Sequence, residues 1–245
     1  MQTVCETRGR PFLKAFNPSK NVMIVFRPRC KQWGCPACAV INTKLWAARA
    51  HRGAFEFQNV GKTLRFLTLT SHENLTAAAS LKVWPKAWKT LHTRANREGG
   101  HGAYLMVPER HKDGRLHMHA IVTWPMGKTW WKDNARESGL GFMADSEVIR
   151  HAGGAASYVT KYLMKSLQDD TWPPRWRRAR PSRDWPKLDK AEKPEGWRFY
   201  PAQKNEPLDD MVLRHAGDGN RVYILDHMSA WEVIEAIDND GVFVR

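Results

Sequence analysis

The sequence predicts an α+β protein in which helices pack against a β-sheet. Two observations carry this prediction. Residues 104–124 have the pattern of a β-hairpin, and strand-like and helix-like segments surround it in the order strand, helix, hairpin, helix, strand, helix. All four cysteines lie in a segment before this core, and a segment rich in Arg and Trp follows it.

The hairpin is predicted from two apolar runs that flank Lys112-Asp113-Gly114. This is the composition of a three-residue loop with glycine in the left-handed conformation. If His111 and Arg115 close the loop, facing residues have numbers that sum to 226. Glu109 then faces His117, and Val107 faces His119.

Side chains alternate between the two faces of a sheet, so His117, His119 and Glu109 are expected on one face. Met118 and Ala120 are expected on the other. Two imidazoles and a carboxylate suit Mn²⁺, Mg²⁺ or Zn²⁺ and leave positions open for substrate, which is typical of a catalytic site. The alternative is a chance His-x-His in a protein with ten histidines. Glu109 is expected on the same face as the two histidines, in an apolar strand where an unpaired carboxylate is costly. This favours the interpretation of the three residues as metal ligands.

The composition indicates a partner that carries many negative charges. The net charge is +14 with a pI near 9.9, and twelve tryptophans accompany it. Aromatic rings interleaved with arginine bind single-stranded nucleic acid by stacking on its bases. The alternative is a basic surface over a tryptophan-rich core. No apolar run reaches the length of a membrane span, and residues 1–12 lack the apolar centre of a signal peptide, so we expect a cytoplasmic protein without a membrane partner.

Four cysteines predict a structural zinc site. Cys30, Cys35 and Cys38 form a short cluster with a Pro and a Gly, and Cys5 is the remaining candidate ligand. The alternative is free thiols, since only Cys35 and Cys38 form a C-x2-C pair. Residues 39–52 then read as an amphipathic helix.

The remaining core elements follow in order. Residues 64–70 alternate as a central strand, and Asn74 or Thr76 is expected to cap a helix with a kink at Pro85. Residues 130–137 are expected to form a short helix, and residues 141–150 a further strand.

Residues 155–165 are expected to form a helix with two stripes. The apolar stripe consists of Ala156, Val159, Leu163 and Leu167. A separate stripe consists of Tyr158, Tyr162, Lys161 and Lys165. Lysines three residues after each tyrosine favour phenolate by charge, and a metal on a scissile phosphate adds activation. The alternative is a pair of ordinary, half-buried tyrosines.

Three ordered motifs resemble those of the HUH endonucleases, specifically the rolling-circle replication initiators of small DNA phages and plasmids. They are Phe66-Leu-Thr-Leu-Thr70, His117-Met-His119, and Tyr158-Val-Thr-Lys-Tyr-Leu-Met-Lys165. The third is similar to the two-tyrosine phage type, and Glu109 stands where related initiators often carry a third ligand. The resemblance covers about residues 61–170.

The resemblance implies an antiparallel sheet of about five strands, with the histidines on central strands and the tyrosine helix alongside. It also implies the chemistry: a tyrosine cleaves single-stranded or hairpin origin DNA through a 5′-phosphotyrosine link, and the freed 3′-OH primes a polymerase. A second tyrosine then cuts the regenerated origin. We accordingly divide the chain into an N-terminal cysteine segment (1–60), a nicking and joining core (61–170) and a C-terminal arm and extension (171–245).

The arm carries six basic residues against one acid over residues 172–187, and its prolines argue against a regular helix. We expect it to contact DNA, the alternative being a disordered basic linker. Expected phosphate ligands are Arg175, Arg177, Arg178 and Arg180, and expected base contacts are Trp176 or Trp185. Beyond it, residues 222–225 and 242–245 read as strands and 230–237 as a helix.

The sequence therefore predicts a metal-dependent, site-specific nickase and ligase that starts rolling-circle replication in a bacterial cell, with host helicase and polymerase as partners. One rival is a transposase or conjugative relaxase of the same superfamily. Relaxases usually carry three histidines, so two histidines with Glu109 favour an initiator. A rival from another class is a non-catalytic, zinc-containing DNA-binding protein in which the tyrosines only stack on bases.

Overall fold

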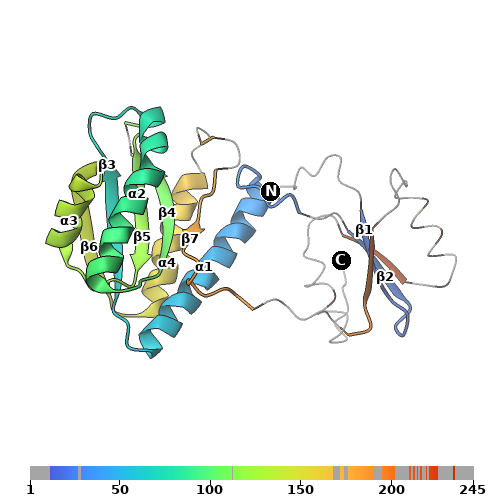
Figure 1. Cartoon of the computed structure of the whole chain (residues 1–245). Coiled ribbons are helices and arrows are strands. Elements are labelled where there is room, and N and C mark those ends of the chain that lie inside the picture. Colours follow the sequence, from blue (N-terminus) through green and yellow to red (C-terminus); the bar gives the residue numbers. More distant parts are fainter. Residues whose placement is uncertain are drawn as a thin grey trace. The chain divides into compact units, whose positions relative to one another are not determined.

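The computed structural model describes residues 12–26, 29–111, 113–167, 172–173, 176–189, 195–201 and 221–225, and the single positions 210, 212, 214, 216, 219 and 234. The chain forms two compact units, one from residues 1–38 and 190–245 and one from residues 39–189. Both are drawn in Figure 1. The functional division into three segments stays a prediction.

The larger unit is built on the predicted antiparallel sheet, which has five strands in the order β6-β3-β5-β4-β7. Every pairing in it is antiparallel. The α+β fold class is therefore confirmed. The strands are β3 (Leu64–Ser71), β4 (Tyr104–Arg110), β5 (Leu116–Val122), β6 (Leu140–Ile149) and β7 (Arg180–Pro181).

The hairpin of β4 and β5 has the predicted register. Glu109 pairs with His117 and Val107 with His119, so the facing numbers sum to 226. The backbone N–H of His111 donates to the carbonyl of Arg115 at 2.9 Å and closes the loop. Gly114 has a φ of 81°, the left-handed conformation that glycine adopts without a steric penalty.

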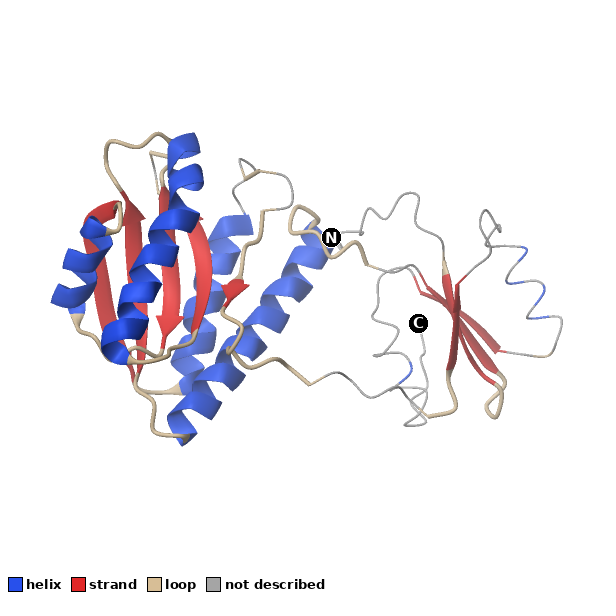
Figure 2. Cartoon of the chain, viewed as in Figure 1, coloured by secondary structure: helices blue, strands red, loops and turns tan. Residues whose placement is uncertain are grey.

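Within the described residues, four helices accompany the sheet (Figure 2). Of the two predicted caps, Thr76 is the one used, and its hydroxyl accepts from the backbone N–H of Ala79 at 3.2 Å. Pro85 lies inside the helix that follows. The helices are α1 (Pro36–Asn59), α2 (Ala77–Gly99), α3 (Lys128–Glu137) and α4 (Ala152–Leu167).

Helices α2 and α3 pack on one face of this sheet and α4 packs on the other. The face under α2 and α3 holds a tryptophan-rich core, in which Trp84, Trp124 and Trp131 are almost fully buried. For these tryptophans the structure therefore supports the alternative interpretation, in which tryptophan forms the core and does not bind nucleic acid. On the other face α4 buries Val159 and Leu163, as predicted, with Ala155 in place of the predicted Ala156.

The smaller unit contains a second sheet, β8-β1-β2-β9, which the sequence analysis did not predict apart from β9. Strand β2 pairs antiparallel with β1 and parallel with β9. Its strands are β1 (Leu13–Asn17), β2 (Val22–Phe26), β8 (Arg198–Pro201) and β9 (Arg221–Leu225). The predicted helix at 230–237, except Ile234, and the predicted strand at 242–245 lie outside the described residues. None of the described helices is both long and apolar enough to cross a membrane.

Candidate active site

The polar ends of three neighbouring strands place their side chains on the α4 face of the five-stranded sheet. Thr68 and Thr70 of β3 pair with His119 and His117 of β5, and Glu109 of β4 pairs with His117. Leu105, Val107 and Ile121 share this face and are buried. The site therefore lies where an apolar face becomes polar at one end of the strands.

His119 is the centre of the polar contacts. It is only 4% exposed, and its Nε2 atom lies 2.7 Å from Oε2 of Glu109. The other carboxylate oxygen of Glu109 accepts from the ammonium of Lys165 at 3.0 Å. The hydroxyls of Thr68 and Thr70 lie 3.2 and 3.4 Å from Nδ1 of His119 and His117. The two imidazole centroids are 4.7 Å apart.

The protonation states suit metal ligands. Burial first, and then the neighbouring His119, lower the pKa of His117 to about 4, and burial also lowers the pKa of His119. Burial disfavours the charged form of Glu109, but hydrogen bonds from His119 and Lys165 outweigh it and lower its pKa to about 2. Near neutral pH the site thus offers two neutral imidazoles and one carboxylate, the forms that bind metal.

The three predicted ligands do not converge fully in this structure. In the described part of the chain, only the three cysteines bring such ligand atoms within 4.8 Å of one another as a set. Glu109 and His119 are in contact, so binding one ion to all three residues requires His117 or this pair to move. The donor set fits a divalent ion by its chemistry.

Helix α4 brings both predicted tyrosines to this face. The Tyr158 hydroxyl lies 3.1 Å from Nδ1 of His119 and 3.2 Å from the Thr68 hydroxyl. Its ring stacks on Phe66 with centroids 4.0 Å apart. The Tyr162 ring stacks directly on the imidazole of His119, with centroids 3.3 Å apart. Both tyrosines thus contact one histidine.

The two lysines differ from expectation. The ammonium groups of Lys161 and Lys165 lie 5.3 and 5.2 Å from the ring centroid of Tyr162, a cation–π distance, and Lys165 is bound to Glu109. Burial raises the pKa of Tyr158 well above its ordinary value, and burial also raises that of Tyr162 despite the charge of Lys165. The expected effect of lysine charge is found for Lys165, which lowers the pKa of Tyr162, but burial outweighs it, and at Tyr158 burial is the largest effect.

The sequence analysis named residues 66–70 as a motif but gave no role to the side chains that contact Tyr158. Phe66, Thr68 and Thr70 occupy alternate positions of β3, and Phe66 and Thr68 both contact Tyr158. The period-two pattern of residues 64–70 places these three on one face, and this signal was available from the sequence.

Two open cavities flank His117 on the side of β6. One, of about 270 Å³, is lined by residues that include Thr68, Lys128 and Lys132. The other, of about 310 Å³, includes His111 and Arg115. His117, Thr70 and the 60% exposed Met143 line both. An open groove lined by Lys132 and by Lys128, which pairs with Asp145 of the same lining at 2.9 Å, therefore reaches the histidines from the side of β6.

The predicted zinc ligands are brought together as far as they are described. Cys30, Cys35 and Cys38 have their sulfur atoms within 4.8 Å of one another, and the Cys30 and Cys38 sulfurs are 3.4 Å apart. Tetrahedral Zn²⁺ with sulfur ligands at about 2.3 Å needs sulfur separations of about 3.8 Å. Cys35 and Cys38 are buried. The cluster is thus compatible with a bound metal such as zinc, and Cys5 lies outside the described residues.

The predicted DNA-binding arm is folded onto the larger unit in part. Trp185 is 1% exposed and its indole N–H donates to the carbonyl of Arg49 at 3.2 Å, so no base can stack on it here. Arg178 is 6% exposed, donates to the Ser166 carbonyl and lies over the Trp172 ring. Arg177 is exposed, and Arg180 lies 4.2 Å from the centroid of the half-buried Trp176 ring. Arg175 lies outside the described residues.

Comparison with known families supports a replication protein. Residues 64–167 match the model of the replication-associated protein family of the ORF2 type. The matched segment begins with β3 and contains the hairpin histidines and both tyrosines. The match supports a replication initiator of the Rep type that binds DNA. Neither curated proteins nor solved structures gave a match.

Proposed function

We propose that this protein is a site-specific nickase and ligase of the HUH type, which cleaves single-stranded or hairpin origin DNA and starts rolling-circle replication. The contact of the Tyr158 hydroxyl with His119, at 3.1 Å, is the observation that carries the proposal. It joins the motif with a potential nucleophile to the motif with potential metal ligands. The match of residues 64–167 to a replication-associated family supports the same conclusion.

In this proposal His117, His119 and Glu109 hold Mn²⁺ or Mg²⁺. The bound ion supplies charge stabilisation to the non-bridging oxygens of the scissile phosphate. The residues present fit this role because burial keeps the imidazoles neutral and two hydrogen bonds keep the carboxylate ionised.

Tyr158 is the first nucleophile in this proposal. Its oxygen forms a bond to phosphorus while the bond from phosphorus to the 3′ oxygen breaks, which gives a 5′-phosphotyrosine and a free 3′-OH. The phenol releases its proton to solvent and the leaving 3′ oxygen takes one up from solvent, so protons balance. When the Nε2 atom of His119 is a metal ligand, the neutral ring carries its proton on Nδ1 and donates it towards the Tyr158 oxygen, which favours the phenolate.

We also propose which part of the DNA strand occupies the groove beside β6. In-line displacement places the attacking and leaving oxygens on opposite sides of phosphorus. Tyr158 reaches the site from α4, and the groove with Lys128 and Lys132 approaches His117 from the side of β6. We therefore assign the groove to the strand that ends in the new 3′-OH.

Tyr162 is the second nucleophile in this proposal. Its ring stacks on His119 and is flanked by the ammonium groups of Lys161 and Lys165. A second tyrosine at the same histidine allows a second cut while the first link is still in place. The two-tyrosine type of initiator needs this arrangement.

The other expectations complete the proposal. Structural zinc is held by Cys5, Cys30, Cys35 and Cys38, and Arg175, Arg177, Arg180 and Trp176 contact DNA outside the active site. Arg178 and Trp185 anchor the arm instead. A host polymerase extends the freed 3′-OH in the bacterial cytoplasm, with a host helicase as the second partner.

The decisive experiment is a search for a covalent protein–DNA adduct. The full chain is incubated with a library of labelled single strands and Mn²⁺, and products are separated under denaturing conditions. We expect a labelled band that protease removes, with one cleavage position in the selected strands. Tight DNA binding without such a band would instead support a non-catalytic DNA-binding protein.

The same adduct would form in a transposase or relaxase of this superfamily. The cleaved sequence separates them, because an initiator cuts within the replication origin of its own replicon. We favour the initiator because the family match is to replication-associated proteins and because Glu109 takes the place of a third histidine.

A further inference from the structure

A cavity of about 430 Å³ lies at the opposite end of β4 from Glu109. Its lining comes from α2, from the loop between α2 and β4, and from the start of β4. Trp124, just after β5, and residues 182–184, just after β7, complete it. At about 3.3 Å per residue, the start of β4 at Tyr104 is roughly 17 Å along the strand from Glu109. Tyr104 belongs to the α2 face, so the cavity shares no side chain with the candidate active site.

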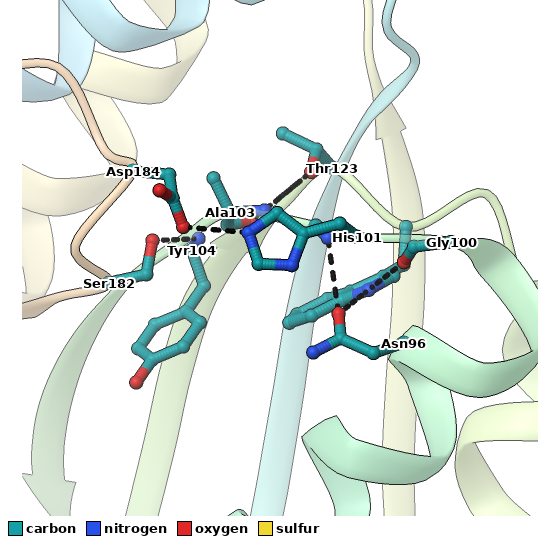
Figure 3. A network of polar contacts seen from close by, with 10 residues as sticks. Asn96, Gly100, His101, Ala103, Tyr104, Thr123, Ser182 and Asp184 are labelled. Carbon is teal, nitrogen blue, oxygen red and sulfur yellow. Dashed lines mark hydrogen bonds and ion pairs between the residues drawn. The ribbon is translucent and has the colours of Figure 1, made fainter.

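The cavity is held in shape by a polar network (Figure 3). Oδ1 of Asn96 accepts from the backbone N–H of Gly102 at 3.1 Å and from the indole N–H of Trp124 at 3.0 Å. The backbone N–H of Tyr104 donates to the Ser182 hydroxyl at 3.0 Å. A Cβ atom at Gly102 would lie 2.4 Å from Trp124, so glycine is needed for this close packing.

The walls offer aromatic surface. This surface comes from Tyr104 and His92, which are half-buried and lie nearly parallel with an interplanar angle of 28°, while Trp124 is 1% exposed and only shapes the cavity. Nδ1 of His92 is buried and has no hydrogen-bond partner among the described residues. A flat ring with polar edges matches such walls, and a cavity of this volume lies within the range of small-ligand sites.

The rim of the cavity carries an acidic and a basic side chain, Asp184 and Arg183. Oδ2 of Asp184 lies 2.9 Å from Nε2 of His101, and their side chains are 49% and 75% exposed. Figure 3 shows the two groups facing each other. Among the described residues, Oδ1 of Asp184 makes no hydrogen bond, and Arg183 beside it is exposed. A carboxylate accepts from the amino group of a base, and an arginine binds phosphate.

We propose that this cavity binds one unstacked base of the DNA strand, with Asp184 accepting a hydrogen bond from an exocyclic amino group and Arg183 contacting the adjacent phosphate. Cytosine, adenine and guanine carry such a group and thymine does not. The proposal deepens the proposed function, on which it rests, since it names a second DNA contact remote from the cleavage chemistry.

A nucleotide is favoured over other ligands by the charge of the chain. A net charge of +14 draws nucleic acid to the protein, and an unstacked base gains stacking energy on aromatic walls. Asp184 opposes that general attraction, because a carboxylate repels phosphate. His101 contacts only one oxygen of this carboxylate, so the other oxygen remains available to accept a hydrogen bond from the amino group of a base.

The test compares two fluorescently labelled strands in an anisotropy titration with the full chain. One is a strand of twenty thymidines, and the other has a single deoxycytidine at its centre. A hydrogen bond to a charged group corresponds to about a tenfold change in affinity, so we expect the cytidine strand to bind about tenfold more tightly. Asp184→Ala removes both carboxylate oxygens, so it should abolish that preference, although removal of a negative charge by itself strengthens DNA binding.

Two further variants localise the effect. Arg183→Ala should weaken binding of both strands more than Lys187→Ala, which removes the same charge from an exposed position of the same segment outside the cavity. Lys187→Ala should keep the cytidine preference. Thermal melting checks that Asp184→Ala, at an exposed position, stays folded.

The proposal is overturned if the wild-type protein shows no cytidine preference, or if Asp184→Ala keeps it by changing the affinity for both strands equally. Adduct formation on a cleavable strand is measured separately with the wild-type protein at saturating DNA. Adduct formation without the base preference therefore refutes only the proposal for the cavity. A base preference without adduct formation refutes only the proposed nickase activity.

Discussion

The imidazole of His119 connects Glu109 to Tyr158: its Nε2 atom lies 2.7 Å from the Glu109 carboxylate and its Nδ1 atom 3.1 Å from the tyrosine hydroxyl. This arrangement has two chemical uses. With a metal ion, His119 is a ligand and its Nδ1–H supports the phenolate. Without one, Glu109 holds the Nε2–H and the free Nδ1 accepts the phenol proton, as in a carboxylate–histidine relay. Substitution of His117 distinguishes these two uses, because metal binding requires His117 and the relay does not.

His117→Ala should therefore abolish cleavage while leaving DNA affinity nearly unchanged. The variant removes one of three proposed metal ligands, whereas affinity depends on lysines and arginines elsewhere. Adduct formation in Mn²⁺ and binding of the same strand are measured side by side. His151→Ala is the matched control, since it removes an exposed imidazole that lies outside the ligand set and lines neither cavity at His117. Full cleavage by His117→Ala, or by the wild type in EDTA, would leave the relay as the explanation.

Protonation of His117 should destabilise the metal-free protein at mildly acidic pH. The pKa of His117 is lowered from 6.5 to about 4 by burial, so below pH 6.5 the unfolded chain binds a proton that the folded chain does not. The free energy of unfolding is therefore highest above pH 6.5. It falls as the pH decreases towards 4, by about 3 kcal/mol at most.

The measurement is urea unfolding in EDTA between pH 7 and 5, above the range in which Glu109 titrates. His117→Gln should lose less stability over this interval than the wild type. His151→Gln, at an exposed position before α4, should behave as the wild type does. Equal losses in all three proteins would show that His117 is not buried as described.

Thr68→Val should slow cleavage by about three- to tenfold at saturating Mn²⁺, because it removes a hydroxyl within 3.2 Å of both Tyr158 and His119. The change keeps the β-branched shape of the side chain. Thr70→Val is the comparison, since the Thr70 hydroxyl lies near Nδ1 of His117 and contacts no tyrosine. It should raise the Mn²⁺ concentration needed for half-maximal rate instead. A shift in Mn²⁺ requirement for Thr68→Val, without a lower maximal rate, would argue against its role as a positioning residue for the nucleophile.

Cys35→Ser should lower the melting temperature and remove about one zinc per chain. A structural zinc site contributes folding free energy directly, so stability falls before chemistry is affected. Ala37→Ser is the matched control, since it adds a hydroxyl in the same turn and keeps all the thiols. Elemental analysis of freshly purified, reduced protein checks the metal. Absence of zinc from the wild-type protein would leave the three clustered cysteines as free thiols.

Local patterns predicted the five-stranded sheet well, because its central strands are joined by a short hairpin whose register follows from one glycine. Gly114 at φ 81° and the His111–Arg115 closure fix every pair from Tyr104 to Arg110. The second sheet could not be predicted in this way. It joins residues 13–26 to residues 198–201 and 221–225, and no local pattern specifies pairing across so long a separation.

The candidate site shows the same limit. Strand alternation placed Glu109, His117 and His119 on one face, because that depends only on register. Which lysine contacts which partner depends on side-chain packing, so the contact of Lys165 with Glu109 was not foreseen. Trp185 was expected at DNA, yet Gly53 leaves room on α1 for its indole, and burial there outweighs exposure to a base.

Tyr158→Phe and Tyr162→Phe test whether the two tyrosines act as separate nucleophiles. Each change removes one oxygen and little volume, so the ring contacts with Phe66 and His119 should remain, and folding and DNA binding should survive. The two positions differ in the structure. The Tyr158 hydroxyl has hydrogen-bond partners on β3 and β5, whereas Tyr162 contacts His119 through its ring face.

We therefore expect each single variant to form one covalent adduct on a short origin strand, with the slower first cut in Tyr158→Phe, because Tyr158 is the one already positioned. The double variant should form none. Circle release, which requires two successive cuts, should fail in both single variants. Tyr200→Phe, at an exposed position of β8, is the control and should complete full rounds. If Tyr162→Phe releases circles at the wild-type rate, Tyr162 only packs on His119, and a single tyrosine performs every cut.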